Sequence, residues 1–364
     1  MRCEQLDYNL PADRIATVPA EPRDAARLMV VDRDRGQIDH RHVRSLGTAG
    51  SPLRRGDLMV FNQTRVLPAS FSGRRAATGG SVCGLYLESP DAGDASQWQV
   101  MLESGGKLTA GESIILTEQD DRLRLTERLA DGQWKAELLS PTPTIDLLNR
   151  IGRPPLPPYI RKARRRRGQA EIRRDDFDRY NTVFGSQPGS VAAPTASLHF
   201  THDLLDAIDR LGVQRASLTL HVGLGTFAPI RTERLEDHVM HREWFCIPAG
   251  TLSALGQVRQ RGGRVIPVGT TCVRGLESLP EPLPTTTYTA RTNLFIAPAQ
   301  SDRAGHTFRF TDALMTNFHL PRSTLLALVA ALPGVGIDRL QQWYQQAIDH
   351  RYRFYSYGDA MLLV

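Results

Sequence analysis

The feature that most constrains the fold is the stretch 189–227, where a polar loop, a helix pattern, a strand pattern and a glycine turn follow one another directly. The loop reads GSVAAPTASLHF, and the last part reads QRASLTLHVGLGTF. Apolar residues recur at helical spacing from Leu204 to Leu211, and Gly212 supplies a stop. Apolar and polar residues then alternate up to Val222, which predicts a strand. A helix that leads straight into a strand indicates an α/β architecture.

The same stretch carries a candidate site. Period two places Thr219 and His221 on the strand face opposite the apolar row. The strand then breaks at 223–226, where two glycines let backbone N–H groups approach a ligand closely. A second histidine, His199, comes just before the helix. Two histidines beside a glycine turn are typical of a binding site, although two structural histidines at an ordinary turn fit so short a motif equally well.

Length and composition set the broad class. A chain of 364 residues with 41% hydrophobic and 23% charged residues can bury a full core and form two or three domains of a soluble protein. The longest apolar run, 325–332, is too short to cross a bilayer, and the N-terminus has no apolar signal region. We therefore expect a cytoplasmic protein, a monomer without a membrane partner. The scattered Cys3, Cys83, Cys246 and Cys272 are expected to be free thiols.

The middle of the chain differs from the rest. Between about 66 and 150, short strand patterns alternate with turn signals and helical periodicity is almost absent. This pattern predicts a small inserted all-β barrel or sandwich. The predicted fold class is thus a mixed α/β main domain, residues 1–65 and 151–364, interrupted by a β-barrel domain at 66–150. The strands expected in the insert are 81–87, 97–102, 112–116, 123–128 and 134–139, with a hairpin turn at 130–132.

A basic run follows the insert. The proline-rich segment 153–158 predicts a stiff extended return path. In 161–167, six of seven residues are basic. Taken alone, the run favours a solvated, partly disordered loop over a dedicated phosphate contact, and 168–188 is also loop-like. The net charge of +6 permits a polyanionic partner without requiring one.

The rest of the main domain alternates strands and helices. A helix at 251–261 and a strand at 264–268 lead into the polar turn 269–271, and a helix restarts at 272. Free N–H groups at such a helix start suit a carboxylate or phosphate. The other expected elements are strands at 28–32, 37–42, 58–61, 294–296 and 307–310 and helices from 323 and 338.

Polar clusters on loops indicate an active site rather than core packing. His238, His241 and Glu243 have a spacing that would place metal ligands on one side of a helix. No second shell of carboxylates accompanies them, so we expect no metal.

Nine motifs in order carry a family resemblance: FNQTRVLPAS, RPPLPPYI, RYNTVFG, GSVAAPTASLHF, TLHVGLGTFAPI, HVMHREWF, VGTTCVRGLES, TNFHLPRSTLL and YRFYSYGDAML. With them the chain resembles the S-adenosylmethionine:tRNA ribosyltransferase-isomerases of queuosine biosynthesis. The resemblance implies an α/β domain with an inserted β-barrel. It also implies transfer of the ribosyl group of S-adenosylmethionine to 7-aminomethyl-7-deazaguanine at the tRNA wobble position, which gives epoxyqueuosine, adenine and methionine.

This chemistry needs a base that removes a hydrogen from C5′ beside the sulfonium, and an acid that protonates adenine. The resemblance makes the following residues candidates for these roles: His199, His221, His319, Glu243 and Asp359. Glycines permit close contact with the nucleoside, Phe200 or Phe227 offers a stacking face, and Arg274 can pair with a carboxylate. The implied S-adenosylmethionine site comprises Pro194, Thr195, Phe200, Gly223, Gly225, Thr226, Phe227, Thr270, Thr271 and Arg274.

On the tRNA side, the resemblance implies contacts from Asn62, Arg65, Arg161, Tyr180 and Asn317. This is also where the chain departs from the family. Gln63 and Asn293 stand where the family usually has aspartate, and an amide cannot pair with a cationic amine as a carboxylate does. Two alternatives follow. The chain uses the same donor with a small-molecule acceptor, or it is a non-catalytic RNA-binding relative.

Overall fold

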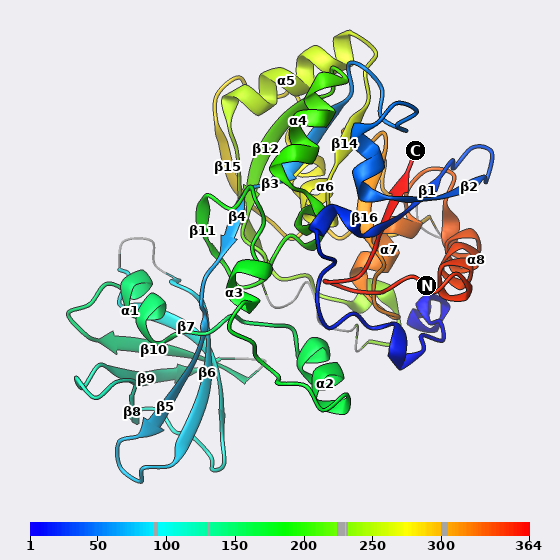
Figure 1. Ribbon diagram of the computed structural model, residues 1–364. Coiled ribbons are helices and arrows are strands. Elements are labelled where there is room, and N and C mark those ends of the chain that lie inside the picture. Colours follow the sequence, from blue (N-terminus) through cyan, green and yellow to red (C-terminus); the bar gives the residue numbers. More distant parts are fainter. Residues whose placement is uncertain (91–93, 130–131, 224–229, 231, 300–304) are drawn as a thin grey trace.

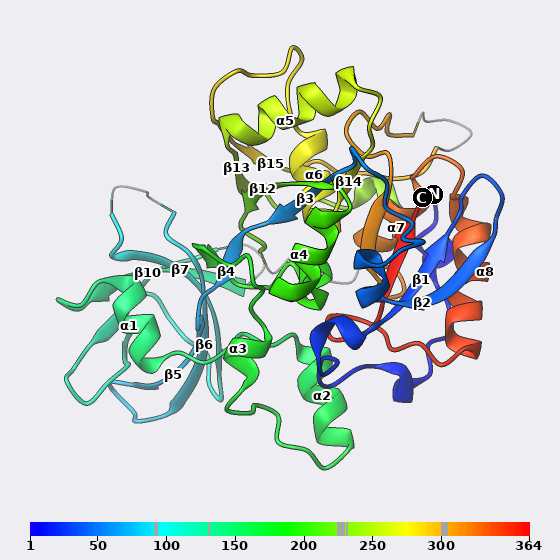
Figure 2. The same cartoon turned by 45° about the horizontal axis from the view of Figure 1, so that its top comes forward.

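The structure is a computed structural model that describes residues 1–90, 94–129, 132–223, 230, 232–299 and 305–364. Figures 1 and 2 show a larger body of helices and sheets, which contains both termini, and a smaller group of strands to one side. The larger body is built on two sheets. An isolated bridge between Val268 and Met315 connects them, so they are neighbours.

The first sheet has five strands in the order β14-β3-β12-β13-β15. Strand β3 pairs in parallel with β14 and β12, while β13 pairs antiparallel with β12 and β15. Residues Met59 and Phe61 of β3 pack against α4, and Leu58 and Val60 pack on the other side with α5 and α6. Because both faces are covered, residues 58–61 of β3 are all apolar. The bounds are β3 Leu58–Asn62, β12 Gln214–Leu220, β13 Glu243–Ile247, β14 Val265–Pro267 and β15 Tyr288–Thr292.

The second sheet has the order β16-β17-β1-β2, in which β17 pairs in parallel with β1. One face packs with α4 and the other with α7 and α8. The strands are β1 Arg27–Val31, β2 Ile38–His42, β16 Leu314–Asn317 and β17 Ala360–Leu363. The helices of the body are α4 His202–Arg210, α5 Ala249–Gln260, α6 Thr270–Glu277, α7 Thr324–Ala330 and α8 Gly336–Asp349.

The opening unit of the sequence folds as predicted. Helix α4 begins after Thr201, whose side chain accepts a hydrogen bond from the backbone N–H of Leu204 at 3.2 Å. Gly212 then has a φ of 77°, a conformation that favours glycine, and β12 follows directly. Both faces of β12 are covered near its end, because Thr219 is buried as well as the apolar row.

Two expected strands are wrong. Residues 294–296 and 307–310 are not in strands. The backbone N–H groups of Arg309 and Phe310 donate to the buried carboxylate of Glu277 instead of to a neighbouring strand. Apolar residues at 294–296 pack against the core without a strand partner. Short apolar runs do not distinguish a strand from a packed loop.

The group of strands at the side contains β5 to β10, which pair antiparallel in the closed order β10-β7-β6-β5-β8-β9. Helix α1, Thr144–Ile151, which the sequence analysis did not predict, receives a hydrogen bond from Trp98 Nε1 at Thr144 Oγ1, 2.8 Å away. Residues 130 and 131 of the expected hairpin turn lie outside the described residues. The strands are β5 Ser70–Arg75, β6 Ser81–Glu88, β7 Gln97–Ser104, β8 Ser113–Ile115, β9 Arg122–Arg128 and β10 Gln133–Leu139.

The basic run is not a disordered loop. Helix α2, Pro158–Arg166, contains most of it, and Pro158 occupies the first helical position, where its missing N–H has no cost. A short helix, α3, Asp176–Arg179, follows. Two small strands, β4 Thr64–Val66 and β11 Gln187–Ser190, then pair in parallel.

Short 3-10 helices complete the described part: Cys3–Leu6, Ala12–Arg14, Arg23–Ala25, Val43–Gly47, Thr195–His199 and Leu235–Asp237. None of the described helices combines the length and the apolar character needed to span a membrane.

Candidate functional site

A pocket with an open volume of about 580 Å³, part of which is open to solvent, lies where five separate segments meet. The segments are the start of α2, the loop before the 3-10 helix at 195, the start of α6, the end of β16 with its following loop and the start of α7, and the loop before β17. The predicted site residues that line it are Pro194, Thr195, Thr270, Thr271, Asn317 and His319.

The start of α6 forms one wall. Strand β14 ends at Pro267, and Gly269 turns the chain with a φ of 98°, a conformation that most other residues rarely adopt. The first N–H groups of α6 have no partner within the helix and form the positive end of its dipole. Thr271 Oγ1 is held from behind by Asn62 Nδ2 at 3.3 Å. This wall therefore suits an anionic group.

Asn317 also lines the pocket, and its side chain is fixed by four partners. Its Oδ1 accepts a hydrogen bond from Thr195 Oγ1 at 2.8 Å. Its Nδ2 lies 3.2 Å from His199 Nε2, 3.4 Å from the carbonyl oxygen of Tyr355 and 3.5 Å from that of Asp359. Burial lowers the pKa of His199 to about 4. A neutral His199 accepts a hydrogen bond from the amide of Asn317 and thereby orients this side chain. His199 itself does not line the pocket.

His319 is the histidine that does line the pocket. Its Nε2 lies 2.8 Å from Thr316 Oγ1, and its backbone N–H donates to the hydroxyl of Tyr344 at 3.0 Å. Burial lowers the pKa of His319 to about 3. The ring is therefore neutral at ordinary pH and has a nitrogen lone pair, which is the state that a general base requires.

His221 lies at the end of β12, outside the pocket lining. Its ring stacks on Trp244 with centroids 4.9 Å apart, and its Nδ1 lies 2.8 Å from Thr64 Oγ1. Burial lowers its pKa to about 4. Gly189 packs against the other side, since a Cβ on this residue would lie 2.6 Å from the His221 ring. Contacts on both sides hold the ring in one orientation.

Glu243 forms a buried ion pair with Arg274 Nη1 and accepts a hydrogen bond from the backbone N–H of Gly223 at 2.9 Å. Arg274 Nε donates to the Leu294 carbonyl at 3.2 Å, while its Nη2 has no hydrogen-bond partner in the described part of the chain. The expected bidentate pairing of Arg274 with a ligand is wrong for this arrangement, because Nη1 is occupied. One guanidinium nitrogen remains for a further acceptor.

The expected helical spacing of the metal candidates is also wrong. His238 and His241 follow a 3-10 helix in irregular chain, and Glu243 begins β13. Within the described ranges, no group of three or more metal-ligating side chains comes together.

Four further candidates are buried and engaged elsewhere, so their expected roles need correction. Phe200 packs edge-on against Phe61 with centroids 5.0 Å apart and offers no stacking face. Asn62 bonds to the backbone of Leu220 and Thr64, so it has no free polar group for tRNA. Tyr180 and Asp359 are likewise buried, and the Tyr180 ring packs edge-on against Tyr357. Asp359 accepts hydrogen bonds from the backbone N–H groups of Arg27 and Arg353 and pairs with the Arg353 guanidinium.

The remaining candidates are either on the surface or outside the residues that the structure describes. Arg65 and Arg161 are exposed, as a contact with tRNA requires. Gly225, Thr226 and Phe227 lie outside the described residues. The sequence analysis did not name four other residues that line the pocket, although the motifs RPPLPPYI, TNFHLPRSTLL and YRFYSYGDAML contain them: Tyr159, Thr316, Tyr355 and Ser356.

The low pKa of His199 predicts acid sensitivity. Its folded pKa of about 4 lies below the ordinary value of about 6.5, so the unfolded state binds more protons between these values and stability falls as the pH falls through this window. Between pH 7 and pH 5, His199 is expected to remove about 2 kcal/mol from the free energy of unfolding. Urea denaturation at both pH values measures this difference in the free energy of unfolding, and the difference should be smaller in His199→Asn. An equal difference in wild type and variant would contradict the prediction.

Comparisons with known proteins identify the family. The profile of the family described as "Queuosine biosynthesis protein" matches residues 3–363. The chain is 46% identical to the S-adenosylmethionine:tRNA ribosyltransferase-isomerase of Sphingopyxis alaskensis over 100% of this chain and 97% of that protein. It is 40% identical to the protein of the same name from Thermotoga maritima over 100% of both chains.

A solved structure supports the same family. The crystal structure of S-adenosylmethionine tRNA ribosyltransferase from Thermotoga maritima is 32% identical, with a TM-score of 0.54, over 99% of this chain and 100% of that chain. The resemblance predicted from the nine motifs is thereby confirmed: the chain belongs to the family of queuosine biosynthesis proteins.

Proposed function

We propose that the chain is an S-adenosylmethionine:tRNA ribosyltransferase-isomerase. It transfers and isomerises the ribosyl group of S-adenosylmethionine onto 7-aminomethyl-7-deazaguanine at the tRNA wobble position, and adenine and methionine leave. The observation that carries the proposal is the identity of 40–46% over the whole chain to relatives with this name. The pocket supports it, because the segments that form it belong to the motifs of the family.

The mechanism begins at the pocket. The sulfonium of S-adenosylmethionine acidifies the C5′ hydrogens, and His319 removes one of them, because it is the neutral histidine that lines the pocket. The resulting ylide opens the ribose ring and expels adenine. The N–H groups at the start of α6 bind the methionine carboxylate, while Thr195 and Asn317 provide polar contacts to the nucleoside.

The proton that adenine needs when it leaves has to come from a group that is protonated at that stage of the reaction. The pKa values of His199, His221 and His319 all lie far below neutral because of burial, so none of these rings holds a proton at pH 7 before the reaction. In our proposal, His319 carries a proton after it has acted as base, and the same ring is then able to return that proton to the departing adenine.

We infer that residues 66–150 form an inserted domain within a main domain of residues 1–65 and 151–364. The closed strand order of β5 to β10 supports this division. So does a separate hydrophobic core, which draws on residues 67–151 with Val191 as the only outside contribution among its described residues.

The amides Gln63 and Asn293, which replace the usual aspartates, predict a lower affinity for the cationic acceptor amine. Gln63 is held by Ser217 and Thr219, and Asn293 is exposed. Changing both to Asp is expected to raise kcat/KM for the tRNA severalfold, since an ion pair of this kind contributes up to about 1 kcal/mol. Steady-state kinetics with tRNA measure it. The control Gln63→Asn/Asn293→Gln keeps both amides, and an equal kcat/KM in all three proteins would contradict the prediction.

The proposed function is tested by incubating the protein with S-adenosylmethionine and tRNA that carries the aminomethyl base. Nucleoside mass spectrometry should detect epoxyqueuosine, and free adenine should appear in equal amount. Adenine release with a small amine but not with tRNA would favour the alternative acceptor, which the amides at Gln63 and Asn293 make worth testing. No cleavage of S-adenosylmethionine under any condition would overturn the proposal.

A further inference from the structure

The positive charge of this protein is concentrated in one short segment. Residues 161–179, here called the basic segment, contain nine of the 45 basic residues and four of the 39 acidic residues. The basic segment therefore carries a net charge of +5, while the whole chain carries +6. The rest of the molecule is nearly neutral. Such a concentration is the electrostatic signature of a surface that binds a polyanion.

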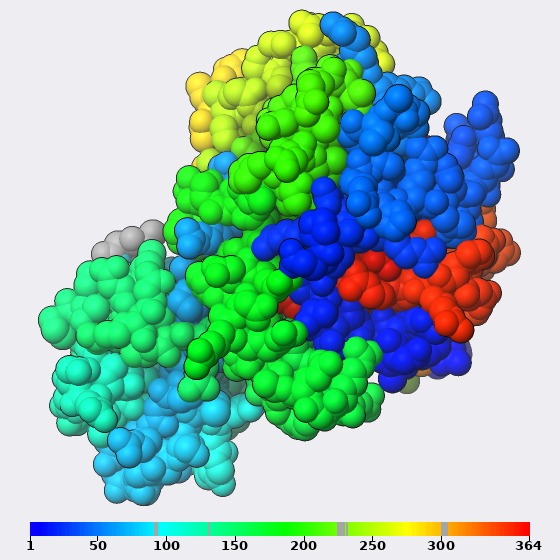
Figure 3. All heavy atoms as spheres, in the orientation of Figure 1, coloured from blue at the N-terminus to red at the C-terminus, as the bar shows by residue number. Residues whose placement is uncertain are grey.

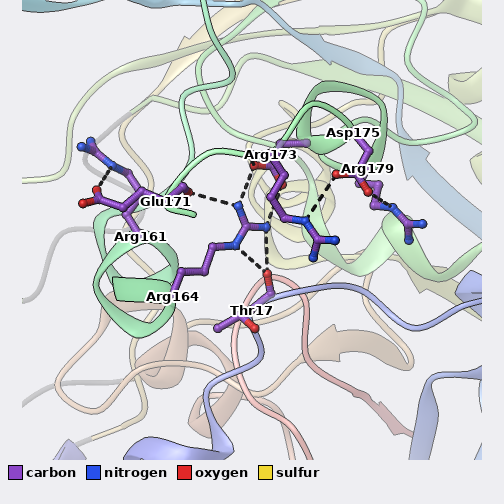
Figure 4. Close-up of polar contacts among 8 residues, drawn as sticks. Thr17, Arg161, Arg164, Glu171, Arg173, Asp175 and Arg179 are labelled. Carbon is purple, nitrogen blue, oxygen red and sulfur yellow. Dashed lines mark hydrogen bonds and ion pairs between the residues drawn. The ribbon is translucent and has the colours of Figure 1, made fainter. Parts of the chain in front are cut away.

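A buried arginine makes this segment rigid. Arg164 forms a bidentate ion pair with Asp176 at 2.6 and 2.7 Å, although both side chains are almost completely buried. Its other donors reach the carbonyl oxygens of Thr17 at 2.9 and 3.0 Å and Glu171 at 3.1 Å, as Figure 4 shows. One side chain thus fixes α2, the following loop and α3 to the N-terminal part of the chain.

The cations around this anchor point outward. Arg161 and Arg165 share a single carboxylate, that of Glu171. Lys162, Arg166 and Arg174 are exposed and have no ion-pair partner among the described residues. Figure 3 shows the segment, coloured green, on the surface beside the blue N-terminal residues. The result is an ordered surface with several uncompensated charges.

The charges on α2 are not explained by helix stability. Lys162 and Arg166 are four residues apart, as are Arg161 and Arg165, and α2 contains no acidic residue. Like charges at this spacing destabilise a helix by about 0.2–0.5 kcal/mol per pair. The basic residues at the end of α2 do match the helix dipole, but those in its first half do not. A function outside the fold explains this pattern better.

The basic segment begins next to the pocket. Tyr159 lines the pocket and its hydroxyl bonds to Ser356, another lining residue. Arg166 lies seven residues further along the same helix, which corresponds to roughly 10 Å. Figures 1 and 2 both place α2 between the group of strands β5 to β10 and the N-terminal part of the main body. An RNA chain that places one base in the pocket would thus bring its neighbouring phosphates over α2.

We propose that the basic segment is the surface that binds the phosphate backbone of the tRNA, with Lys162, Arg166 and Arg174 as direct contacts and Arg164 as the positioning residue. This inference rests on the proposed function for the identity of the RNA. The surface reads charge and shape and leaves recognition of the base to the pocket. Exposed cations without partners are available to phosphates, while those that share Glu171 are held in fixed orientations.

The test replaces the three unpaired cations together, as Lys162→Ala/Arg166→Ala/Arg174→Ala. Affinity for unmodified tRNA at physiological salt should fall by about 10-fold or more. The slope of log K against log salt concentration should become shallower by about 2 to 3, since each lost phosphate contact removes nearly one unit. The matched control, Arg44→Ala/Arg54→Ala/Arg261→Ala, removes three exposed arginines from other elements and should change the affinity by less than about twofold.

Binding and turnover are measured separately. In the variant, KM for modified tRNA should rise while kcat at saturating tRNA stays unchanged. If the wild-type protein makes no product but the variant still loses tRNA binding, the proposed function fails and the surface assignment stands. Equal affinity and equal salt dependence in wild type and variant would overturn the assignment. Tighter binding of the wild type to phosphatidylglycerol vesicles than to tRNA would also overturn it.

Discussion

Replacing His319 by Gln is expected to lower the rate of adenine release from S-adenosylmethionine by about 10²–10⁴-fold, the usual contribution of a general base. The ring lines the pocket, is neutral because burial lowers its pKa to about 3, and is positioned by Thr316. Gln keeps a polar side chain of similar reach but cannot take a proton. The loss should therefore appear in kcat, while the dissociation constant of S-adenosylmethionine changes little.

Single-turnover measurement of adenine, with equilibrium binding of S-adenosylmethionine, separates these effects. His221→Gln is the comparison, because His221 has a similarly low pKa but lies outside the pocket lining. It should lose much less activity. If His221→Gln loses more than His319→Gln, the role of base passes to His221. Thermal denaturation of both variants shows whether either loss comes from unfolding.

Replacing Asp176 by Asn is expected to destabilise the protein by about 3–5 kcal/mol. This change leaves the Arg164 charge buried without its carboxylate, and the carbonyl oxygens of Thr17 and Glu171 cannot neutralise it. Urea denaturation followed by circular dichroism measures the loss. The destabilisation should be accompanied by weaker tRNA binding if α2 shifts before the whole protein unfolds.

The adjacent carboxylate supplies a matched control. Asp175 pairs with Arg173 and Arg179, but its side chain is 44% exposed. Asp175→Asn should therefore cost no more than about 1 kcal/mol. The double variant Arg164→Met/Asp176→Leu removes both buried charges and should recover much of the stability lost in Asp176→Asn. A loss in Asp176→Asn no greater than that in Asp175→Asn would show that the buried pair does not anchor this segment.

Much of the architecture could be predicted because several elements carry complete local signals. Helix α4 has an N-cap at Thr201 and a stop at Gly212, and β3 is apolar on both faces. The sequence analysis predicted no strand at β16 or β17, since runs such as AMLL are too short to show a clear period. Their pairing depends on segments far away in the chain.

The candidate site was predicted in part. Motif positions such as Thr195, Thr271 and His319 do meet in the pocket, because they lie at the ends of elements. A motif does not reveal whether its residue faces the pocket or the core, and Phe200 and Asn62 were misassigned for this reason. The loop interpretation of the basic run failed similarly. Composition alone does not show that Arg164 meets a carboxylate twelve residues away.

The position of β17 has a consequence for how the molecule is made. This strand lies between β16 and β1 and is the last described strand in chain order. During synthesis, β1 can pair with β2 early, but its other edge has no partner until β17 has been made. The second sheet therefore closes only after residues 360–363 have left the ribosome, and until then the edge of β1 is exposed to chaperones and to aggregation.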